Sequence, residues 1–329
     1  MSSHEQPTIA VEIESEFSFE KWLEVELQKQ YIEIAQALNE VGLLEIIPEL
    51  GEKGIRGIDG NVYPIPTIEA IKDELLKDRK TYEMKMKQGF TKINLVPVAL
   101  PIAKLIDVYK IQLLDHFKRG KLFYSRFQNK GPEPILPDMF NKSAPVVVSQ
   151  DMTNADVEGR LNYFPHNIKG DFGKSKTELL AALAKTPFSG WMIELMEDNV
   201  HIPLRGKVIR KGGRLQFAAG ESPRDYREDL ASSRACEDEG GRIIDSAITQ
   251  AIVDLHNKNQ VISGEWVDDY GEWILSNSIP DSSHRVPGFG WSREGKCAFI
   301  RNYIPDARSR TTGFRPVVTV GLWNNDKFS

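Results

Sequence analysis

Apolar residues recur every three or four positions in two stretches near the N-terminus, and this spacing predicts amphipathic helices. The first helix begins after Ser18, which can cap it, and ends before Gly42. The second begins at Thr67, directly after a proline, and continues to Met86. Residues 51–66, between them, are rich in glycine and proline and therefore predict a loop.

These two helices are expected to form a helical N-terminal extension over residues 1–87. The first helix carries a wide apolar stripe, made of Trp22, Leu23, Leu27, Tyr31, Ile34 and Leu38. Burying such a stripe at ~25 cal/mol per Å² contributes several kcal/mol, so it is too costly to leave in water. We expect it to pack on the rest of the chain or, as the alternative, on a second copy in a homo-oligomer.

Residues 88–329 are expected to form one further domain, in which short apolar runs alternate with helical patterns. Strand-like runs cover residues 91–101, 145–150, 160–164, 190–198, 206–219, 273–279, 297–303 and 314–320. Helical patterns cover residues 102–120, a segment from Ser222, and residues 243–258. Because helices interrupt the strands irregularly, the predicted fold class is α+β, with the strand at 313–320 central in the sheet.

Composition narrows the class of protein. The net charge of -5 argues against a general nucleic-acid binder, which would carry a basic surplus. No run approaches the ~18 apolar residues of a membrane span, and the acidic N-terminus lacks the apolar core of a secretory signal. Two cysteines, Cys236 and Cys297, are too few for a four-ligand metal set. The expectation is a cytoplasmic protein with no metal or cofactor and with two free thiols, a single disulfide between the two cysteines being the alternative.

Two short motifs resemble known sites but lack parts that those sites need. Gly173-Lys174-Ser175 would end a phosphate loop, yet the required glycine five positions earlier is Ile168, so Ser175 is expected to cap a helix instead. Residues 323–326, Trp-Asn-Asn-Asp, are similar to a cation-binding motif of sugar-binding lectins. No acidic ligand pair leads into them, so no calcium site is expected.

Two groups of charged residues could belong either to a functional site or to an ordinary solvated surface. Carboxylates that could form acid–base pairs are Glu194, Glu197, Asp198, Asp268 and Asp269, although acidic residues are common at strand ends. Basic residues surround a Gly-Gly turn and fit either a solvated hairpin or an anion site: Arg205, Lys207, Arg210, Lys211 and Arg214. The six histidines show neither HExxH nor HxH spacing, so none is expected to bind a metal.

A series of segments between Gln88 and Val320 resembles one known family. In order, they are KQGFTKINLVPVALPIAKLIDVYK, GKSKTELL, GWMIELMEDNVHIP, GKVIRKGGRLQFAAGESPRDY, AITQAIVDLHNKNQVI and VPGFGWSREGKCAFIRNYIPDARSRTTGFRPVVTV. Their order and spacing resemble the variable proteins of diversity-generating retroelements. The resemblance implies a C-type-lectin-like domain of the formylglycine-generating-enzyme type at residues 88–329, with the variable region near 288–315.

The same resemblance implies a non-enzymatic, ligand-binding protein with a hypervariable surface. The expected framework of that surface is Trp291, Arg293, Ala298, Ile300, Pro305, Arg308, Gly313, Phe314 and Arg315. The expected ligand-binding, variable positions are Ser292, Glu294, Lys296, Cys297, Phe299, Arg301, Tyr303, Asp306 and Arg310. Their mixture of aromatic, charged and hydroxyl groups is typical of a paratope, so the unknown ligand is expected to be a protein.

Strand alternation refines this expectation. Phe299, Arg301 and Tyr303 should share one exposed face, with Trp291, Ile300 and Phe314 buried beneath.

The alternative function is an oxidase of the formylglycine-generating type. That enzyme needs two closely spaced cysteines, whereas this region contains Cys297 alone.

Overall fold

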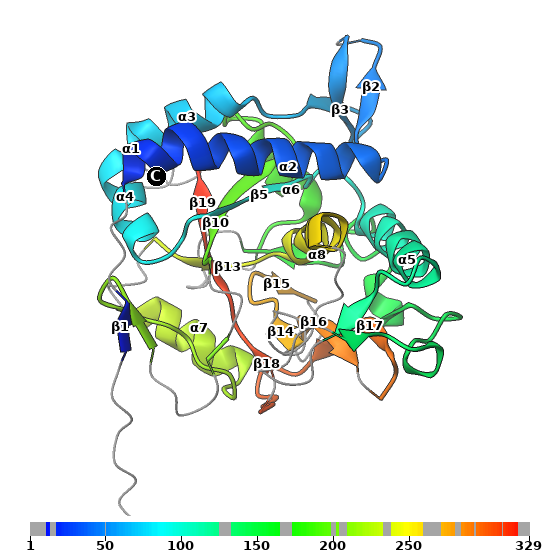
Figure 1. The fold of residues 1–329 in the computed structure, drawn as a ribbon. Coiled ribbons are helices and arrows are strands. Elements are labelled where there is room, and N and C mark those ends of the chain that lie inside the picture. The colour runs from blue at the N-terminus through cyan, green and yellow to red at the C-terminus, as the bar shows by residue number, and fades with distance from the viewer. Residues whose placement is uncertain are drawn as a thin grey trace, which may run out of the picture.

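The fold is mixed α+β, with several sheets and helices packed around a shared core (Figure 1). The computed structural model describes residues 11–13, 18–49, 51–124, 133–164, 173–198, 202–203, 209–232, 238–258, 271–279, 284–292, 294–310 and 312–321. Its helices are α1 (Phe19–Lys21), η1 (Trp22–Glu26), α2 (Leu27–Glu40), α3 (Ile68–Lys77), α4 (Arg79–Lys87), α5 (Ile102–Lys118), α6 (Lys176–Leu183), α7 (Pro223–Ser232) and α8 (Ile244–Lys258), with short 3-10 turns η2 (Pro137–Met139) and η3 (Gln150–Met152).

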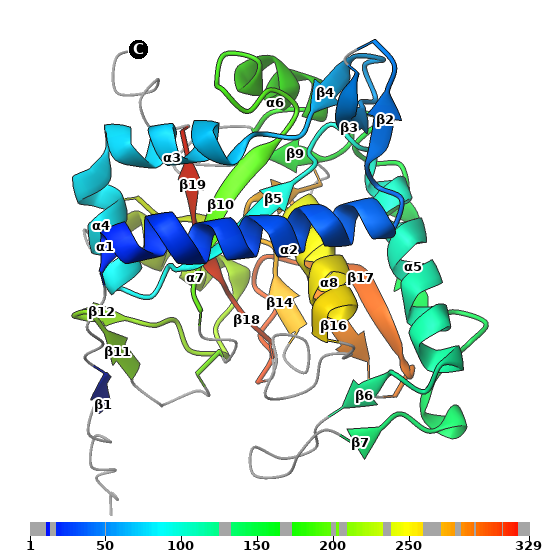
Figure 2. The same ribbon diagram turned by 45° about the horizontal axis from the view of Figure 1, so that its top comes forward.

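The first predicted helix is confirmed, because α1, η1 and α2 follow one another without a break. Figure 2 shows α2 lying across β5 (Lys92–Val96) and α8, both of which it contacts. Trp22 is buried, and its Nε1 donates to the Thr91 carbonyl oxygen at 2.9 Å. The apolar stripe thus packs within the chain, and one hydrophobic cluster includes residues on both sides of position 87.

The second predicted helix divides into α3 and α4. The side chain of Thr67 accepts a hydrogen bond from the Ala70 amide, as a helix cap should. The backbone then leaves helical geometry at Asp78, with φ of -125° and ψ of 49°. The predicted loop at 51–66 instead contains most of a small antiparallel sheet, formed by β2 (Glu45–Ile47), β3 (Glu52–Arg56) and β4 (Val62–Pro64).

A four-stranded antiparallel sheet crosses the middle of the molecule in the order β13, β19, β10, β5. Its members besides β5 are β10 (Met192–Met196), β13 (Gly240–Gly241) and β19 (Pro316–Val320). Every residue of β10 and β19 is buried. The apolar part of the predicted strand at 313–320 lies inside this sheet as β19, but Gly313 belongs to a strand of a different sheet, so the predicted single strand is divided.

A second sheet of five strands runs in the order β18, β14, β16, β17, β8. It contains β8 (Val146–Val148), β14 (Gly271–Trp273), β16 (Val286–Ser292), β17 (Cys297–Tyr303) and β18 (Thr312–Gly313). Helices α5 and α8 contact this sheet, and the rings of Tyr109 and Phe289 lie 6.0 Å apart. One face of the β16–β17 hairpin therefore belongs to the main core.

The remaining strands form small pairings at the edges. Strand β1 (Val11–Ile13) is parallel to β11 (Ile209–Lys211), which pairs with β12 (Arg214–Leu215). Two further pairs are β6 (Phe123–Tyr124) with β7 (Glu133–Pro134), and β9 (Asn162–Tyr163) with β15 (Asn277–Ser278). In the described part of the chain, no helix is long and apolar enough to cross a membrane.

Buried ion pairs join elements that are distant in sequence. Lys176 Nζ lies 2.8 Å from Asp156 Oδ2 and 2.7 Å from Asp245 Oδ1, and all three side chains are fully buried. Lys176 begins α6, whose capping box at Ser175 is present as expected. The helix cap thus places a buried lysine between two carboxylates, and no feature of the sequence motif indicates that pairing.

Candidate functional site

The residues of β17 alternate between the core and the opposite face of the sheet. Ala298 and Ile300 are buried in the main hydrophobic cluster. Phe299 is half-buried and Arg301 is exposed on the other face. The strand's hydrogen-bonded neighbours, β16 and β8, hold this alternation in register, so the outward side chains have a rigid base.

Arg301 and Phe299 form one unit on the outward face. The Arg301 guanidinium lies over the Phe299 ring, 5.3 Å from its centroid. Among the described residues, no carboxylate forms an ion pair with Arg301. An exposed arginine on an aromatic ring is a frequent anchor in protein–protein interfaces, because it combines apolar area with a directional charge.

Tyr303 shares this face but is tied to the structure beneath. Its ring packs edge-on against Trp273, with the centroids 4.9 Å apart. A Cβ atom on Gly288 would lie 2.7 Å from the Tyr303 ring, so the glycine makes room for that ring. Burial raises the pKa of the Tyr303 hydroxyl above its ordinary value, while Arg301 partly offsets this rise. Tyr303 is therefore as much a packing residue as a surface residue.

The β16–β17 turn rests on the segment before β8. The Gly295 amide donates to Ser292 Oγ at 3.0 Å, and Lys296 adopts a left-handed backbone with φ of 54°. The Asn141 amide donates to the Lys296 carbonyl oxygen at 2.8 Å, and Lys296 Nζ donates to the Asp138 carbonyl oxygen. Glu294, at the tip, is exposed. The turn is thus fixed at its base and open at its tip.

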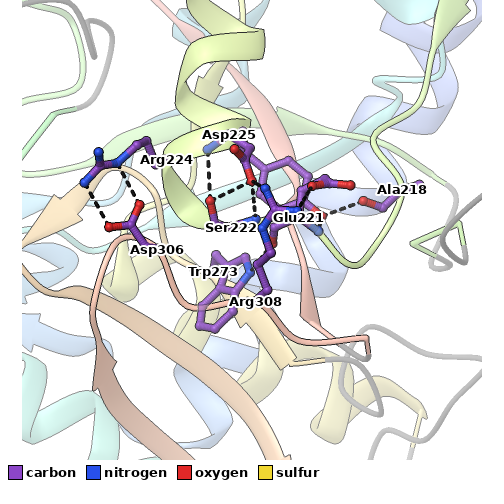
Figure 3. Close-up of polar contacts among 9 residues, drawn as sticks. Ala218, Glu221, Ser222, Arg224, Asp225, Trp273, Asp306 and Arg308 are labelled. Atoms are coloured by element: carbon purple, nitrogen blue, oxygen red, sulfur yellow. Dashed lines mark hydrogen bonds and ion pairs between the residues drawn. The ribbon is translucent and has the colours of Figure 1, made fainter.

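The loop after β17 is attached to the start of α7 (Figure 3). The Arg224 amide donates to the Pro305 carbonyl oxygen at 3.1 Å, and the Arg224 side chain pairs with Asp306. Arg308 pairs with Asp225 at 2.7 Å and with Glu221 at 3.4 Å. These contacts bring the N-terminus of α7 to the surface that β17 and its loop form.

A small aromatic cluster lies below this attachment. Phe314, Tyr226 and Trp273 are buried there, and the Phe314 and Tyr226 rings are 5.7 Å apart. The Tyr226 hydroxyl donates to the Ala218 carbonyl oxygen, and Trp273 Nε1 donates to the Glu221 carbonyl oxygen at 3.2 Å. The cluster therefore fixes the sheet, α7 and the segment before α7 in one arrangement.

Most of the predicted binding positions are exposed or half-buried, on the β16–β17 turn, on β17 and on the loop that follows it. Exposed positions are Glu294, Lys296, Arg301, Asp306 and Arg310, and half-buried ones are Ser292, Phe299 and Tyr303. Of the residues expected beneath them, Ile300 and Phe314 are buried as predicted. Arg293, of the expected framework, lies outside the described residues.

Two residues differ from the expectation. Cys297, the first residue of β17, is 1% exposed. Burial also raises the pKa of its thiol, which disfavours the reactive thiolate. Trp291 is half-buried rather than buried, because its ring stacks on Phe140 near the margin of the main core.

The other candidate groups are mostly engaged in structural contacts. Glu194 is fully buried and accepts a hydrogen bond from Ser246 Oγ. Arg214 is buried too, paired with Glu239 at 2.6 Å and with Glu197, so the solvated-hairpin interpretation is wrong for this residue. Lys211 pairs with Asp198. Positions 205, 207, 268, 269 and 323–326 lie outside the described residues.

Among the described residues, no group of three or more histidine, cysteine or acidic side chains could hold a metal ion. Comparison of the chain with protein-family models, curated proteins and solved structures found no match. Sequence reasoning missed Arg224, Glu221 and Asp225 as neighbours of the loop after β17. The paired residues Arg224 and Asp306 are 82 positions apart, and no spacing rule links the two segments.

Proposed function

We propose that the protein is a non-enzymatic, cytoplasmic ligand-binding protein whose outward β17 face and following loop bind another protein. The observation that carries the proposal is the exposed Arg301 guanidinium stacked on Phe299, without an ion-pair partner among the described residues. The inward residues of the same strand belong to the core. Side chains on the outward face other than Tyr303 can therefore change with little effect on folding, as a variable binding surface requires.

The proposal includes the resemblance to variable proteins of diversity-generating retroelements. In this proposal, residues 88–329 have a C-type-lectin fold of the formylglycine-generating-enzyme type, and 288–315 is the diversified region. The exposed positions on the turn, strand and loop support this, because they follow the framework–variable pattern of that region. Buried Cys297 departs from the pattern, so we remove it from the proposed ligand contacts.

Sequencing of the surrounding locus tests the proposed origin of the variation. A near-copy of the codons for 288–315, beside a reverse-transcriptase gene and differing chiefly at adenines, is the expected result. A locus with neither a near-copy nor a reverse transcriptase would contradict the retroelement assignment. The binding surface itself would then need a different evolutionary explanation.

The alternative function is an oxidase of the formylglycine-generating type on the same fold. Its chemistry needs two closely spaced thiols, whereas this region contains Cys297 alone. Burial also raises the pKa of the Cys297 thiol, which disfavours the reactive thiolate. Purified protein incubated with copper and a cysteine-containing peptide should form no aldehyde. Turnover that disappears in Cys297→Ser would support the oxidase.

A further inference from the structure

The Arg224–Asp306 pair has the geometry of a bound carboxylate. Arg224 Nε lies 2.9 Å from Asp306 Oδ1, and its Nη2 lies 3.1 Å from Oδ2. Two parallel N–H donors thus contact the two oxygens of one carboxylate, which is the arrangement by which arginine recognises acidic ligands. The side chains are 58% and 62% exposed, so a partner can reach the guanidinium.

The loop does not depend on this pair for its position. The Arg224 amide is bonded to Pro305, the Gly220 amide donates to the Thr312 carbonyl oxygen at 3.1 Å, and Arg308 is held by Asp225. Hydrogen bonds from Ser222 and the nearby Arg308 keep the pKa of Asp225 below its ordinary value, so that anchor stays charged. Since an exposed ion pair contributes little to stability, Asp306 can change while the loop stays in place.

The first turn of α7 is otherwise occupied. The Asp225 amide donates to Ser222 Oγ at 3.2 Å, and Asp225 Oδ2 accepts from the Ser222 amide at 3.0 Å. Hydrogen-bond donors at this helix start are therefore already used within the chain. An acidic group arriving from outside has the Arg224 guanidinium as its partner.

We infer that Arg224 binds an acidic polypeptide segment and that it stays the same when the variable positions of the surface change. In this chain the Asp306 carboxylate occupies the Arg224 guanidinium. The inference rests on the proposed function, in which position 306 varies and Arg224, outside 288–315, does not. An acidic residue at 306 occupies the guanidinium, and any other residue leaves it open to a partner's carboxylate. Position 306 thereby sets whether the surface accepts acidic partners.

Titration with a capped hexaglutamate peptide tests this directly. The dissociation constant of a fluorescently labelled peptide is measured by anisotropy for the full chain, for Asp306→Asn and for each control variant, so that the same readout serves variants that lack Arg224. Freeing one exposed arginine for one carboxylate should strengthen binding about two- to fivefold. The Arg224→Gln/Asp306→Asn double variant should lose this gain.

The matched control is Glu294→Gln, which removes one exposed negative charge from the same surface without touching Arg224. Equal gains in Glu294→Gln and Asp306→Asn would overturn the inference, because general charge would then explain the binding. A gain that persists in the double variant would overturn it as well. Neither outcome bears on whether the β17 face tolerates variation, so failure of the proposed function remains distinguishable.

Discussion

Glu194 offers the sharpest test of how the buried scaffold behaves. It lies on β10 between Asn94 and Ser246, and its side chain is fully buried. Burial raises the pKa of this carboxyl to about 7, although Arg242 and the hydrogen bonds of Ser246 and Asn94 oppose the rise. The folded protein therefore holds a proton that the unfolded chain, with an ordinary pKa of 4.5, releases.

The sign of the effect follows from linkage. The stability associated with the protonated Glu194 is fully present below the unfolded pKa and is lost as pH rises through the folded pKa near 7. In Glu194→Gln the side chain is neutral at every pH, so this loss disappears. The stability of the variant relative to the natural chain should increase by about 2 kcal/mol between pH 5 and pH 8.

Urea unfolding of both proteins at intervals from pH 5 to pH 8 measures this difference. Glu272→Gln is the contrasting control, because Glu272 is the 3.0 Å partner of buried Arg242 and its loss leaves that charge uncompensated. It should destabilise the protein at pH 8. A stability difference for Glu194→Gln that stays constant across the range would refute the reasoning.

Further predictions concern packing and charge. Tyr303→Ala should lower the free energy of unfolding by about 2 kcal/mol, since it empties the space over Gly288 and beside Trp273, and a thermal melt with no shift would contradict that packing role. Lys176→Met should cost about 3 to 5 kcal/mol because it strands two buried carboxylates. The exposed Lys87→Met, which loses only its pair with Glu83, should cost under about 1 kcal/mol in the same unfolding assay. Equal losses of stability for the two lysine variants would show that Lys176 is not paired with the buried carboxylates of Asp156 and Asp245.

Local sequence patterns predicted the elements that depend only on residues close together in the sequence. The first helix, the Ser175 cap and the inner position of β19 all follow from periodicity, capping residues and apolar runs. The division of the predicted strand at 313–320 between two sheets does not follow from them. The strands at 51–66 were missed because glycine and proline favour loops. There, a Cβ on Gly54 would meet the Tyr63 backbone, so glycine allows close strand pairing instead.

For the candidate site, the sequence predicted only which side chains of β17 point toward the core and which point away from it. Alternation placed Ile300 inward and Arg301 outward, because a strand of period two leaves no other choice once one face is buried. It could not show that Tyr303 packs on Trp273 or that Arg224 pairs with Asp306. Those contacts depend on how α7 and the second sheet are placed in space, which no local pattern encodes.

The central claim is that the outward face of this hairpin and loop is a binding surface separable from the core. Its most direct test is surface display of two libraries. One randomises the outward positions Glu294, Lys296, Phe299, Arg301, Asp306 and Arg310, and the other randomises the inward positions Phe289, Ala298 and Ile300.

The measurement is the fraction of displayed variants that resist protease, followed by selection of the resistant variants on immobilised hen lysozyme. The account predicts that most outward variants stay folded and yield lysozyme binders, whereas most inward variants are cleaved. Equal cleavage of the two libraries, or an outward library that folds but yields no binder, would contradict it.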